Sequence, residues 1–335
     1  MSIESGSRPD SRLDQLTAWL RESMGAGISD PVPASSDASF RRYFRLRCGD
    51  ASYIAMDAPP EREASRPFVE IALRLGMHGV KVPQVYRYDL GLGFMLLSDM
   101  GERSYLSALD EAAVERLYAD ALDTLLRIQA TDPTGLPPYD ETLLRRELAL
   151  FEDWLLGKHL GLRLTAGQRR LLHEAFDALV QASLEQPRVF VHRDYHSRNL
   201  MAGPHGPGVL DFQDAVIGPV TYDLVSLLRD CYIAWPRARV EAWALRYRDA
   251  AVRAGLIDHT PDEVFLRWLD LTGIQRHLKA SGIFARLYRR DGKPGYLADI
   301  PRTLGYVLEV GPDHPESEGL SRLIVELRLA ERLRP

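Results

Sequence analysis

The spacing of apolar residues in the first part of the chain predicts a helix followed by a small sheet. Residues 11–24 carry a helical stripe of leucines, which is typical of an amphipathic helix. After a run of breakers at residues 30–33, residues 35–46 and 52–59 read as two antiparallel strands. The other elements expected here are a helix over 67–78 and strands over 82–88 and 94–97. We therefore expect a small α+β lobe over residues 1–100.

The pattern changes after this lobe and becomes mostly helical. Thr165 and Gln168 form a capping box, which marks the start of one of the helices. Apolar stripes at helical spacing predict helices within 114–128, 144–155 and 171–179, and further helices near 222–233, 238–254, 262–288 and 318–333. We expect residues 101–335 to form a helical lobe with these stripes and most of the Trp residues in its core.

A hairpin is predicted in the middle of this second part. The apolar run 189–191 indicates a short buried strand, and residues 209–212 indicate another. The residues between 202 and 208 are rich in turn formers. Polar residues on such a hairpin would be held on a loop that leaves a rigid element, where catalytic groups are well placed.

Four polar residues of this hairpin match a phosphoryl-transfer pattern. His192, Asp194 and Asn199 follow the first strand, and Asp211 lies in the second. Phosphoryl transfer needs a carboxylate to accept the proton of the acceptor hydroxyl, for which we assign Asp194, and oxygen ligands for Mg²⁺, for which we assign Asn199 and Asp211. Each residue alone could be a turn former, a cap or a buried core histidine. The whole set in this order favours the catalytic interpretation.

Composition excludes several other classes of protein. The chain has 335 residues, and its 42 Lys and Arg against 47 Asp and Glu give a net charge of −5, which offers no electrostatic footprint for nucleic acid. Cys48 and Cys231 lack metal-ligand spacing, so we expect free thiols. No stretch is long and apolar enough for a membrane span, and the N-terminal residues lack the apolar core of a signal peptide. We expect a cytoplasmic monomer.

The segments HRDYHSRNLM and VLDFQD resemble the aminoglycoside phosphotransferase/choline kinase family, small-molecule relatives of the protein kinases. The resemblance implies an α+β, protein kinase-like fold with two lobes: a small antiparallel-sheet N-lobe that binds nucleotide and a mainly helical C-lobe with the catalytic loop and acceptor site. It also implies ATP and Mg²⁺ as cofactors. Residues 211–214 run almost directly into GPVTYDL without a long activation segment, which argues against a protein substrate.

The same resemblance implies a nucleotide site in the first lobe. The loop that covers the phosphates in the family corresponds here to Ser36, Asp37, Ala38 and Ser39. The family's lysine on the third strand is absent, because Met56 or a neighbour occupies its place, so its usual pair with Glu70 cannot be assumed. We hypothesise that Arg41 or Arg42 supplies the missing charge. The backbone of Ser98, Asp99 and Met100 is the expected hinge that pairs with adenine.

For the acceptor, SSDASFRRYFRL, LLSDMG and GPVTYDLVSLLRD are similar to a bacterial branch of sugar kinases that act on the anomeric hydroxyl of N-acetylmuramate and N-acetylglucosamine in cell-wall recycling. Carried over, Asp194 takes the proton of that hydroxyl and His192 braces the loop. His196, Gln213 and Asp214 could contact the sugar or simply stabilise the loops. Asp223 is expected to anchor the loop or cap the next helix.

N-acetylmuramate carries a lactyl carboxylate, so a cation is expected near it. Arg276, Lys279 and Arg286 are candidates to set the preference for this sugar, although each alone reads as part of an exposed helix face. Two alternatives stay open at this point. One is a kinase for an amino alcohol or an aminoglycoside, and the other is an ATP-binding regulator without catalysis, which would not need Asp194.

Overall fold

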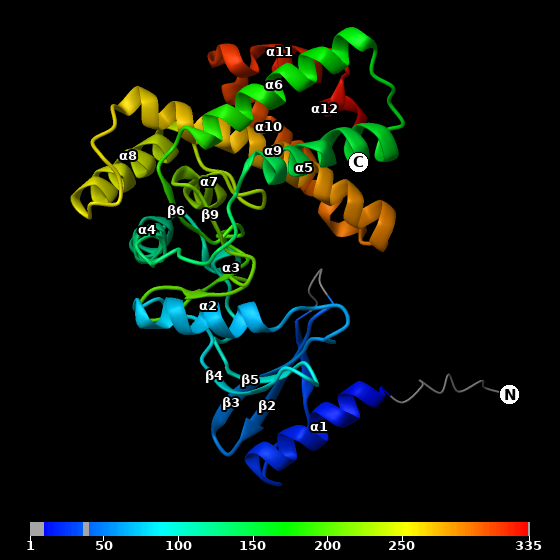
Figure 1. Ribbon diagram of the computed structural model, residues 1–335, viewed down its shortest axis with the longest axis vertical. Helices are drawn as coiled ribbons and strands as arrows, with labels where there is room; N and C mark the ends of the chain where they lie inside the picture. The colour runs from blue at the N-terminus through cyan, green and yellow to red at the C-terminus, as the bar shows by residue number, and fades with distance from the viewer. Residues whose placement is uncertain (1–9, 36–39, 334–335) are drawn as a thin grey trace, which may run out of the picture. The chain divides into compact units, whose positions relative to one another are not determined.

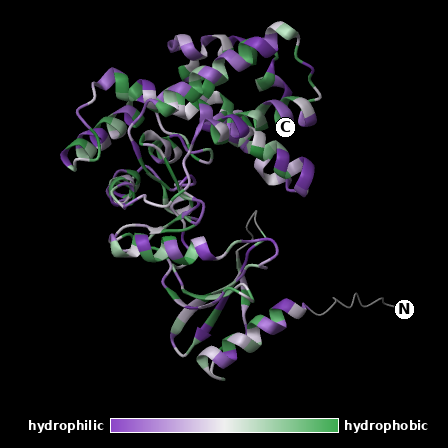
Figure 2. Cartoon of the chain, in the orientation of Figure 1, coloured by the Kyte–Doolittle hydropathy of each residue, from purple (hydrophilic) through white to green (hydrophobic). Residues whose placement is uncertain are grey.

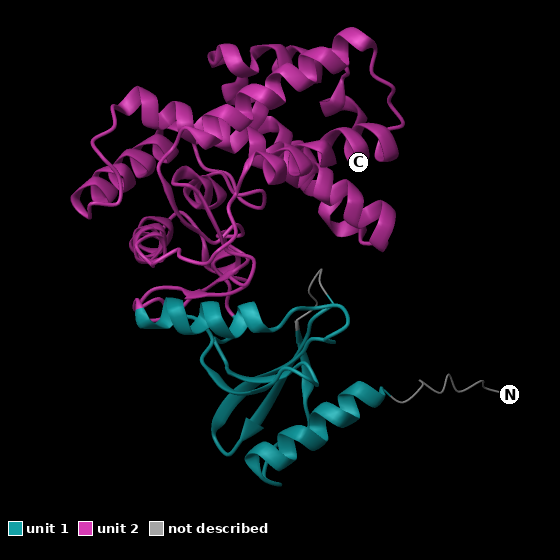
Figure 3. Ribbon diagram, in the orientation of Figure 1, with its two compact units in different colours: residues 1–77, 81–102 teal, residues 78–80, 103–335 magenta. Residues whose placement is uncertain are grey.

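The computed structural model describes residues 10–35 and 40–333. The chain divides into two compact units, shown in different colours in Figure 3. The first unit comprises Met1–Met77 and Lys81–Glu102, and the second comprises His78–Val80 and Arg103–Pro335.

Within residues 10–35 and 40–102, the first unit forms a five-stranded sheet with two helices (Figure 1). The strand order is β1-β2-β3-β5-β4, and every neighbouring pair is antiparallel. Leu16 and Leu20 of α1 pack against Phe44, Leu46 and Phe94 of the sheet, because the helix turns its apolar stripe toward it. Figure 2 shows hydrophobic and hydrophilic residues mixed along α1 and α2, as amphipathic helices require. The bounds are α1 Ser11–Met24, β1 Val32–Ser35, β2 Arg42–Cys48, β3 Ala51–Asp57, α2 Arg66–Met77, β4 Val85–Asp89 and β5 Phe94–Ser98.

The second unit is mainly helical and contains two small antiparallel sheets, β6 with β9 and β7 with β8. Its strands are β6 Arg188–Val191, β7 Leu200–Met201, β8 Gly208–Val209 and β9 Val216–Pro219. Its α-helices are α3 Tyr105–Ala108, α4 Val114–Gln129, α5 Glu141–Leu150, α6 Ala166–Leu184, α7 Thr221–Leu228, α8 Arg237–Arg253, α9 Asp262–Asp291, α10 Ile300–Val310, α11 Pro315–Glu326 and α12 Leu329–Arg332. A π-helix, η1 Phe151–His159, follows α5, and the 3₁₀-helices are η2 Pro294–Asp299 and η3 Gly311–Asp313.

Helix α9 is the central element of this unit. It has 30 residues and packs against α5, η1, α6, α7 and α10, so most of its middle is buried. One contact is very close: a Cβ added at Gly282 would lie 2.4 Å from the carbonyl carbon and oxygen of Leu150, where α5 passes into η1. Only glycine allows the two backbones to approach so closely.

Several expected elements are wrong in detail. Residues 30–33 were expected to interrupt regular secondary structure, yet Val32 and Pro33 belong to β1. This is an edge strand, where proline is tolerated. Helix α10 was not expected at all, and the helix expected over 222–233 ends at Leu228. The helix expected over 318–333 is interrupted at Arg328, whose φ of 52° is left-handed. Among the Trp residues, only Trp235 and Trp243 are buried.

In the described part of the chain, none of the helices combines the length and apolarity that crossing a bilayer would demand.

Candidate active site

The candidate catalytic residues lie on the loop that joins β6 to β7. Strand β7 pairs with β8, and the backbone N–H of Leu210 donates to the carbonyl of Asn199 at 2.9 Å. The strand expected over residues 209–212 is shorter than predicted, because β8 ends at Val209 and Asp211 lies just beyond it. Strand β6 pairs with β9 instead of the hairpin partner expected from the sequence.

His192 is completely buried and joins both arms of the site. Its ring Nε2 lies 2.9 Å from the carbonyl oxygen of Leu210, and its Nδ1 lies 3.2 Å from the backbone N–H of Asp194. Burial lowers the pKa of His192 to about 4, so the imidazole is neutral at physiological pH. A neutral ring that donates from Nε2 and accepts at Nδ1 satisfies both bonds.

Asp223, on α7, anchors the start of the catalytic loop. Its buried carboxylate accepts the backbone N–H of His192 at 2.6 Å and that of Arg193 at 2.9 Å. Burial raises the pKa of Asp223 to about 7, although the two N–H groups favour its charged form. Arg193 has a φ of 79°, which is unusual for a residue with a side chain. The loop is held in this conformation by Asp223, one of the two roles that the sequence suggested for it.

Asp194 lies close to the cations Lys279, Arg193 and Arg276 and to the ring of His196. Burial alone would raise the pKa of its carboxyl, but Lys279, His196 and Arg193 together outweigh burial and hold the pKa below its ordinary value. Arg276 acts in the same direction. The carboxylate is therefore ionised at neutral pH, as a proton acceptor must be.

The structure brings Asn199 and Asp211 together. The side-chain amide of Asn199 donates to the carbonyl oxygen of Asp194 at 3.0 Å and lies 3.5 Å from Oδ2 of Asp211. Gln213 donates to Oδ1 of Asp211 at 2.7 Å, and Asp211 itself adopts a left-handed φ of 63°. Strained backbone of this kind is common at active sites.

This pair fits a magnesium ion. No group of three or more His, Cys, Asp or Glu side chains suited to a metal occurs among the described residues. Mg²⁺ does not need one, because it is usually bound by one or two protein oxygens together with substrate phosphates and water. The amide oxygen of Asn199 and the carboxylate of Asp211 are ligands of the required hard type.

Sequence reasoning missed a buried charge cluster beside this loop. Glu147 of α5 accepts from Tyr139 and Arg193 and pairs with Lys279 of α9 at 3.0 Å. Lys279 also donates to the hydroxyl of Tyr222 at 2.9 Å. Burial disfavours the charged form of Lys279, but Glu147 outweighs it and raises the pKa of the ammonium. The stripe that contains Glu147 reads as ordinary core, and no signal in the sequence marks this residue.

The expectation that Arg276, Lys279 and Arg286 lie on an exposed helix face is wrong. Arg276 is 6% exposed and Lys279 is 7% exposed. A guanidinium nitrogen of Arg276 lies 3.6 Å from the sulfur of Cys231, and Arg286 is half-buried. Helix α9 buries this face because other helices pack around it.

The other predicted acceptor residues differ in their surroundings. His196 packs edge-on against Tyr232, with ring centroids 5.4 Å apart, and burial lowers its pKa. Asp214 is exposed, and its carbonyl oxygen lies 3.4 Å from Nη1 of Arg193. Gln213 is buried against Asp211 as described above. Contact of these residues with a sugar stays a prediction.

Asp230 is a second anchor that the sequence did not reveal. It is completely buried just after α7 and accepts the backbone N–H of Ser197 at 2.8 Å and that of Tyr232 at 2.9 Å. It therefore links the catalytic loop to the segment that carries Tyr232.

In the first unit, the predicted phosphate loop, Ser36 to Ser39, lies outside the described residues. Arg41 is buried and pairs with Glu63 at 2.9 Å. Arg42 pairs with the buried Asp57, which also accepts from Arg12, and with Asp10. Both arginines are engaged by carboxylates of their own unit, and their contact with phosphate stays a prediction.

The hinge segment is held by its side chains. Asp99 accepts from Arg45 and from the hydroxyl of Ser52, each at 2.6 Å. The backbone N–H of Ser98 already donates to Gln84 at 2.9 Å. Pairing with adenine would therefore use the remaining backbone groups between Ser98 and Met100.

Met56 or a neighbour was expected at the place of the family's lysine, and which of them corresponds to it stays a prediction. Met56 is completely buried in β3, and Glu70 of α2 is exposed and lies 3.9 Å from Arg66. Glu70 therefore has a different cationic neighbour from the one that the family pattern expects.

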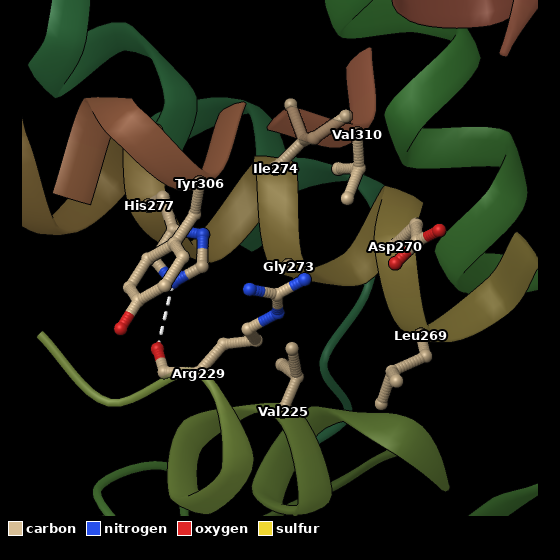
Figure 4. Close-up of a pocket in the computed structure, with 9 residues that line it drawn as sticks. All are labelled: Val225, Arg229, Leu269, Asp270, Gly273, Ile274, His277, Tyr306 and Val310. Carbon is tan, nitrogen blue, oxygen red and sulfur yellow. Dashed lines mark hydrogen bonds between the residues drawn. The ribbon is translucent and has the colours of Figure 1, made fainter. Parts of the chain in front are cut away.

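A small cavity lies in the second unit between α7, α9 and α10 (Figure 4). Its volume is about 10 Å³, enough for about one water molecule. The ring of His277 and the carbonyl of Arg229, joined at 2.8 Å, lie at one side. No predicted site residue lines it, and it is too small for a sugar.

Comparison with known proteins places these features in a family. The sequence profile of the Phosphotransferase enzyme family matches residues 30–262. The chain is 47% identical over 334 residues to the N-acetylmuramate/N-acetylglucosamine kinase of Pseudomonas putida, covering 96% of this chain and 98% of that protein. It is 48% identical over 329 residues to the kinase of the same name from Pseudomonas aeruginosa, covering 95% and 97%.

Solved structures share the fold at low sequence identity. The choline kinase of Streptococcus pneumoniae has a TM-score of 0.60 at 11% identity and covers 87% of this chain and 98% of its own. An aminoglycoside phosphotransferase with bound ADP has a TM-score of 0.59 at 15% identity, covering 87% and 97%. The predicted α+β kinase-like fold, with a small antiparallel sheet and a mainly helical remainder, is confirmed. The chain belongs to the phosphotransferase enzyme family.

Proposed function

We propose that this protein is an ATP-dependent sugar 1-kinase that phosphorylates the anomeric hydroxyl of N-acetylmuramate and N-acetylglucosamine in cell-wall recycling. The observation that carries the proposal is the near-complete coverage of relatives that bear this name, by a chain that keeps Asp194, Asn199 and Asp211 in one loop system. A cytoplasmic location fits the need for ATP and the two free cysteines.

In this proposal Asp194 is the general base. The anomeric oxygen attacks the γ-phosphorus of ATP while its proton passes to the carboxylate of Asp194, and ADP leaves as the bond to the β-phosphate oxygen breaks. The depressed pKa of Asp194 keeps it ionised and ready. His192 positions the loop and does not itself contact the reactants, because both nitrogens of its neutral ring are engaged in hydrogen bonds with backbone groups.

Asn199 and Asp211 would hold Mg²⁺. The ion would neutralise charge on the phosphates and orient the terminal group for transfer. Gln213 supports the site by fixing one oxygen of Asp211.

The first unit would bind the nucleotide, and the second would hold the catalytic loop and the sugar. The contacts we propose for ATP are the loop Ser36 to Ser39, the charge of Arg41 or Arg42, and the backbone of Ser98, Asp99 and Met100. The ADP-bound structural relative supports a nucleotide in this fold.

An acceptor panel tests the proposal. Purified protein with ATP and Mg²⁺ should release ADP with N-acetylmuramate and N-acetylglucosamine, but not with choline, ethanolamine or an aminoglycoside. Asp194→Asn should lower kcat by roughly 10²–10⁴-fold, because the base is lost. Asp153→Asn removes an exposed aspartate of η1 and should leave kcat unchanged.

Two results would count against the proposal. ADP release with choline or an aminoglycoside and not with the sugars would move the protein to another branch of the family. Full sugar-dependent activity in Asp194→Asn would remove the assigned base.

A further inference from the structure

Arg198 is a cation that the catalytic machinery described above does not use. It immediately precedes Asn199 on the catalytic loop, and its side chain is exposed. The guanidinium of Arg198 forms no ion pair and no hydrogen bond with any residue that the structure describes. A charge in this position is available to a ligand.

Aromatic rings hold this guanidinium in place. Its central carbon lies 3.6 Å from the ring centroid of Tyr232 and 5.6 Å from that of Tyr296. Tyr296 stacks on Phe284, with centroids 5.7 Å apart and an interplanar angle of 20°. We refer to Arg198, Tyr232, Phe284 and Tyr296 as the arginine–aromatic platform. Stacking on a ring face leaves the N–H groups at the edge of the guanidinium free to bind.

The platform is tied to the catalytic loop at two points. The carboxylate of Asp230 accepts hydrogen bonds from the backbone N–H groups of Ser197 and Tyr232. These bonds hold the catalytic loop next to the segment that carries Tyr232. The ring of His196 packs against the edge of Tyr232. The charges of Asp194 and Arg198 both act on His196, which lies between them in sequence. The platform is therefore close to the proposed base.

No carboxylate among the described residues forms an ion pair with Arg198. Asp230 is occupied by the two backbone groups, and Asp299 pairs with Arg302 at 3.0 Å. Asp299 is close enough for Arg198 to act on its ionisation but not to form an ion pair. The anion that completes the platform would come from the substrate.

We propose that Arg198 binds the lactyl carboxylate of N-acetylmuramate and that the platform sets the preference for this sugar over N-acetylglucosamine, which lacks the carboxylate. The inference rests on the proposed sugar-kinase function. The planar fork of an arginine matches a carboxylate with two parallel hydrogen bonds. Lys279, by contrast, is already paired with Glu147, and Arg276 is buried beside Cys231. Arg198 thus replaces them as the first candidate for specificity.

The test compares kcat/KM for the two sugars in Arg198→Gln and the wild type. We expect a loss of roughly ten- to a hundredfold for N-acetylmuramate, the range for a charge-assisted bond, and little change for N-acetylglucosamine. The retained N-acetylglucosamine activity shows that the variant folds. Arg246→Gln removes an exposed arginine of α8 and should change neither value.

The methyl ester of N-acetylmuramate tests the same contact from the substrate side. The wild type should lose about the same factor with the ester, and Arg198→Gln should lose nothing further, because both changes remove one interaction. Equal loss for both sugars in Arg198→Gln, or an ester that the wild type accepts as well as the acid, would overturn the role of Arg198 and leave the proposed function standing. A wild type inactive on both sugars would overturn the proposed function itself.

Discussion

At the residue scale, the site depends on charges that compensate for burial. Burial alone would raise the pKa of Asp194, but Lys279, His196 and Arg193 outweigh burial and lower it, and Glu147 in turn raises the pKa of Lys279. Such a cluster can set the pKa of the proposed base from the protein side. We therefore assign Lys279 as a positioning residue.

Lys279→Met should move the acidic limb of the pH profile of kcat/KM. In the wild type the pKa of Asp194 lies below its ordinary value, so activity persists as the pH falls toward that value. Without the ammonium, burial is less opposed and the pKa of Asp194 rises, so the base is protonated at a higher pH. The limb therefore moves to higher pH. Steady-state rates across the acidic range measure the shift.

The matched control is Lys158→Met, which removes an exposed lysine of η1 that lies over Trp154. It should leave the limb in place. A profile of Lys279→Met that is lower at every pH but not displaced would show that Lys279 has only a packing role.

Single residues of the site differ in how well the sequence could reveal them. The sequence alone allows a site to be proposed at His192, Asp194, Asn199 and Asp211, because these residues fall within one short segment in a fixed order. Glu147 and Lys279 are not, because they meet only after α5 and α9 pack together, and a buried ion pair has no local pattern.

At the scale of elements, the junction of α5 with η1 packs very closely against α9. A π-helix adds width to a helical turn and is often found at functional sites. Glu147 lies in α5 just before this junction, and Lys279 lies close to Gly282 on α9. The close backbone approach at Gly282 thus holds together the two helices that carry the charge cluster.

Gly282→Ala should destabilise the protein by about 1–3 kcal/mol, the usual cost of overpacking, because its methyl group would lie 2.4 Å from backbone atoms of Leu150. Gly305→Ala is the control: it is also helical, in α10, and a Cβ there meets nothing within 4 Å. It should be neutral or raise stability by about 1 kcal/mol. Denaturant unfolding of the two variants measures the difference, and equal stability would contradict the tight contact.

Elements were predictable where the apolar period was clean. Helices α4, α8 and α9 follow their stripes closely, whereas α10, which contains Pro301 and Gly305, was not predicted. Pro301 in fact lies in the first turn, where no partner for its missing N–H is needed. Local chemistry of this kind depends on where a helix begins, which the sequence alone does not fix.

At the scale of the whole molecule, the fold class followed from the resemblance and the change from mixed to helical patterning. Each unit has a core of its own, the first built on its sheet and the second around α9. The surroundings of Arg41 and Arg42 could not be foreseen, because Glu63, Asp57 and Asp10 approach them only in the folded unit. In the proposed function, the first unit binds the nucleotide and the second binds the sugar.

The position of the transferred phosphate is the most direct test of this account. Wild-type protein, ATP, Mg²⁺ and N-acetylmuramate should yield a sugar phosphate whose phosphorus couples to the anomeric proton in a proton–phosphorus correlation spectrum. Coupling to the methylene protons of C6, or no sugar phosphate at all, would contradict it.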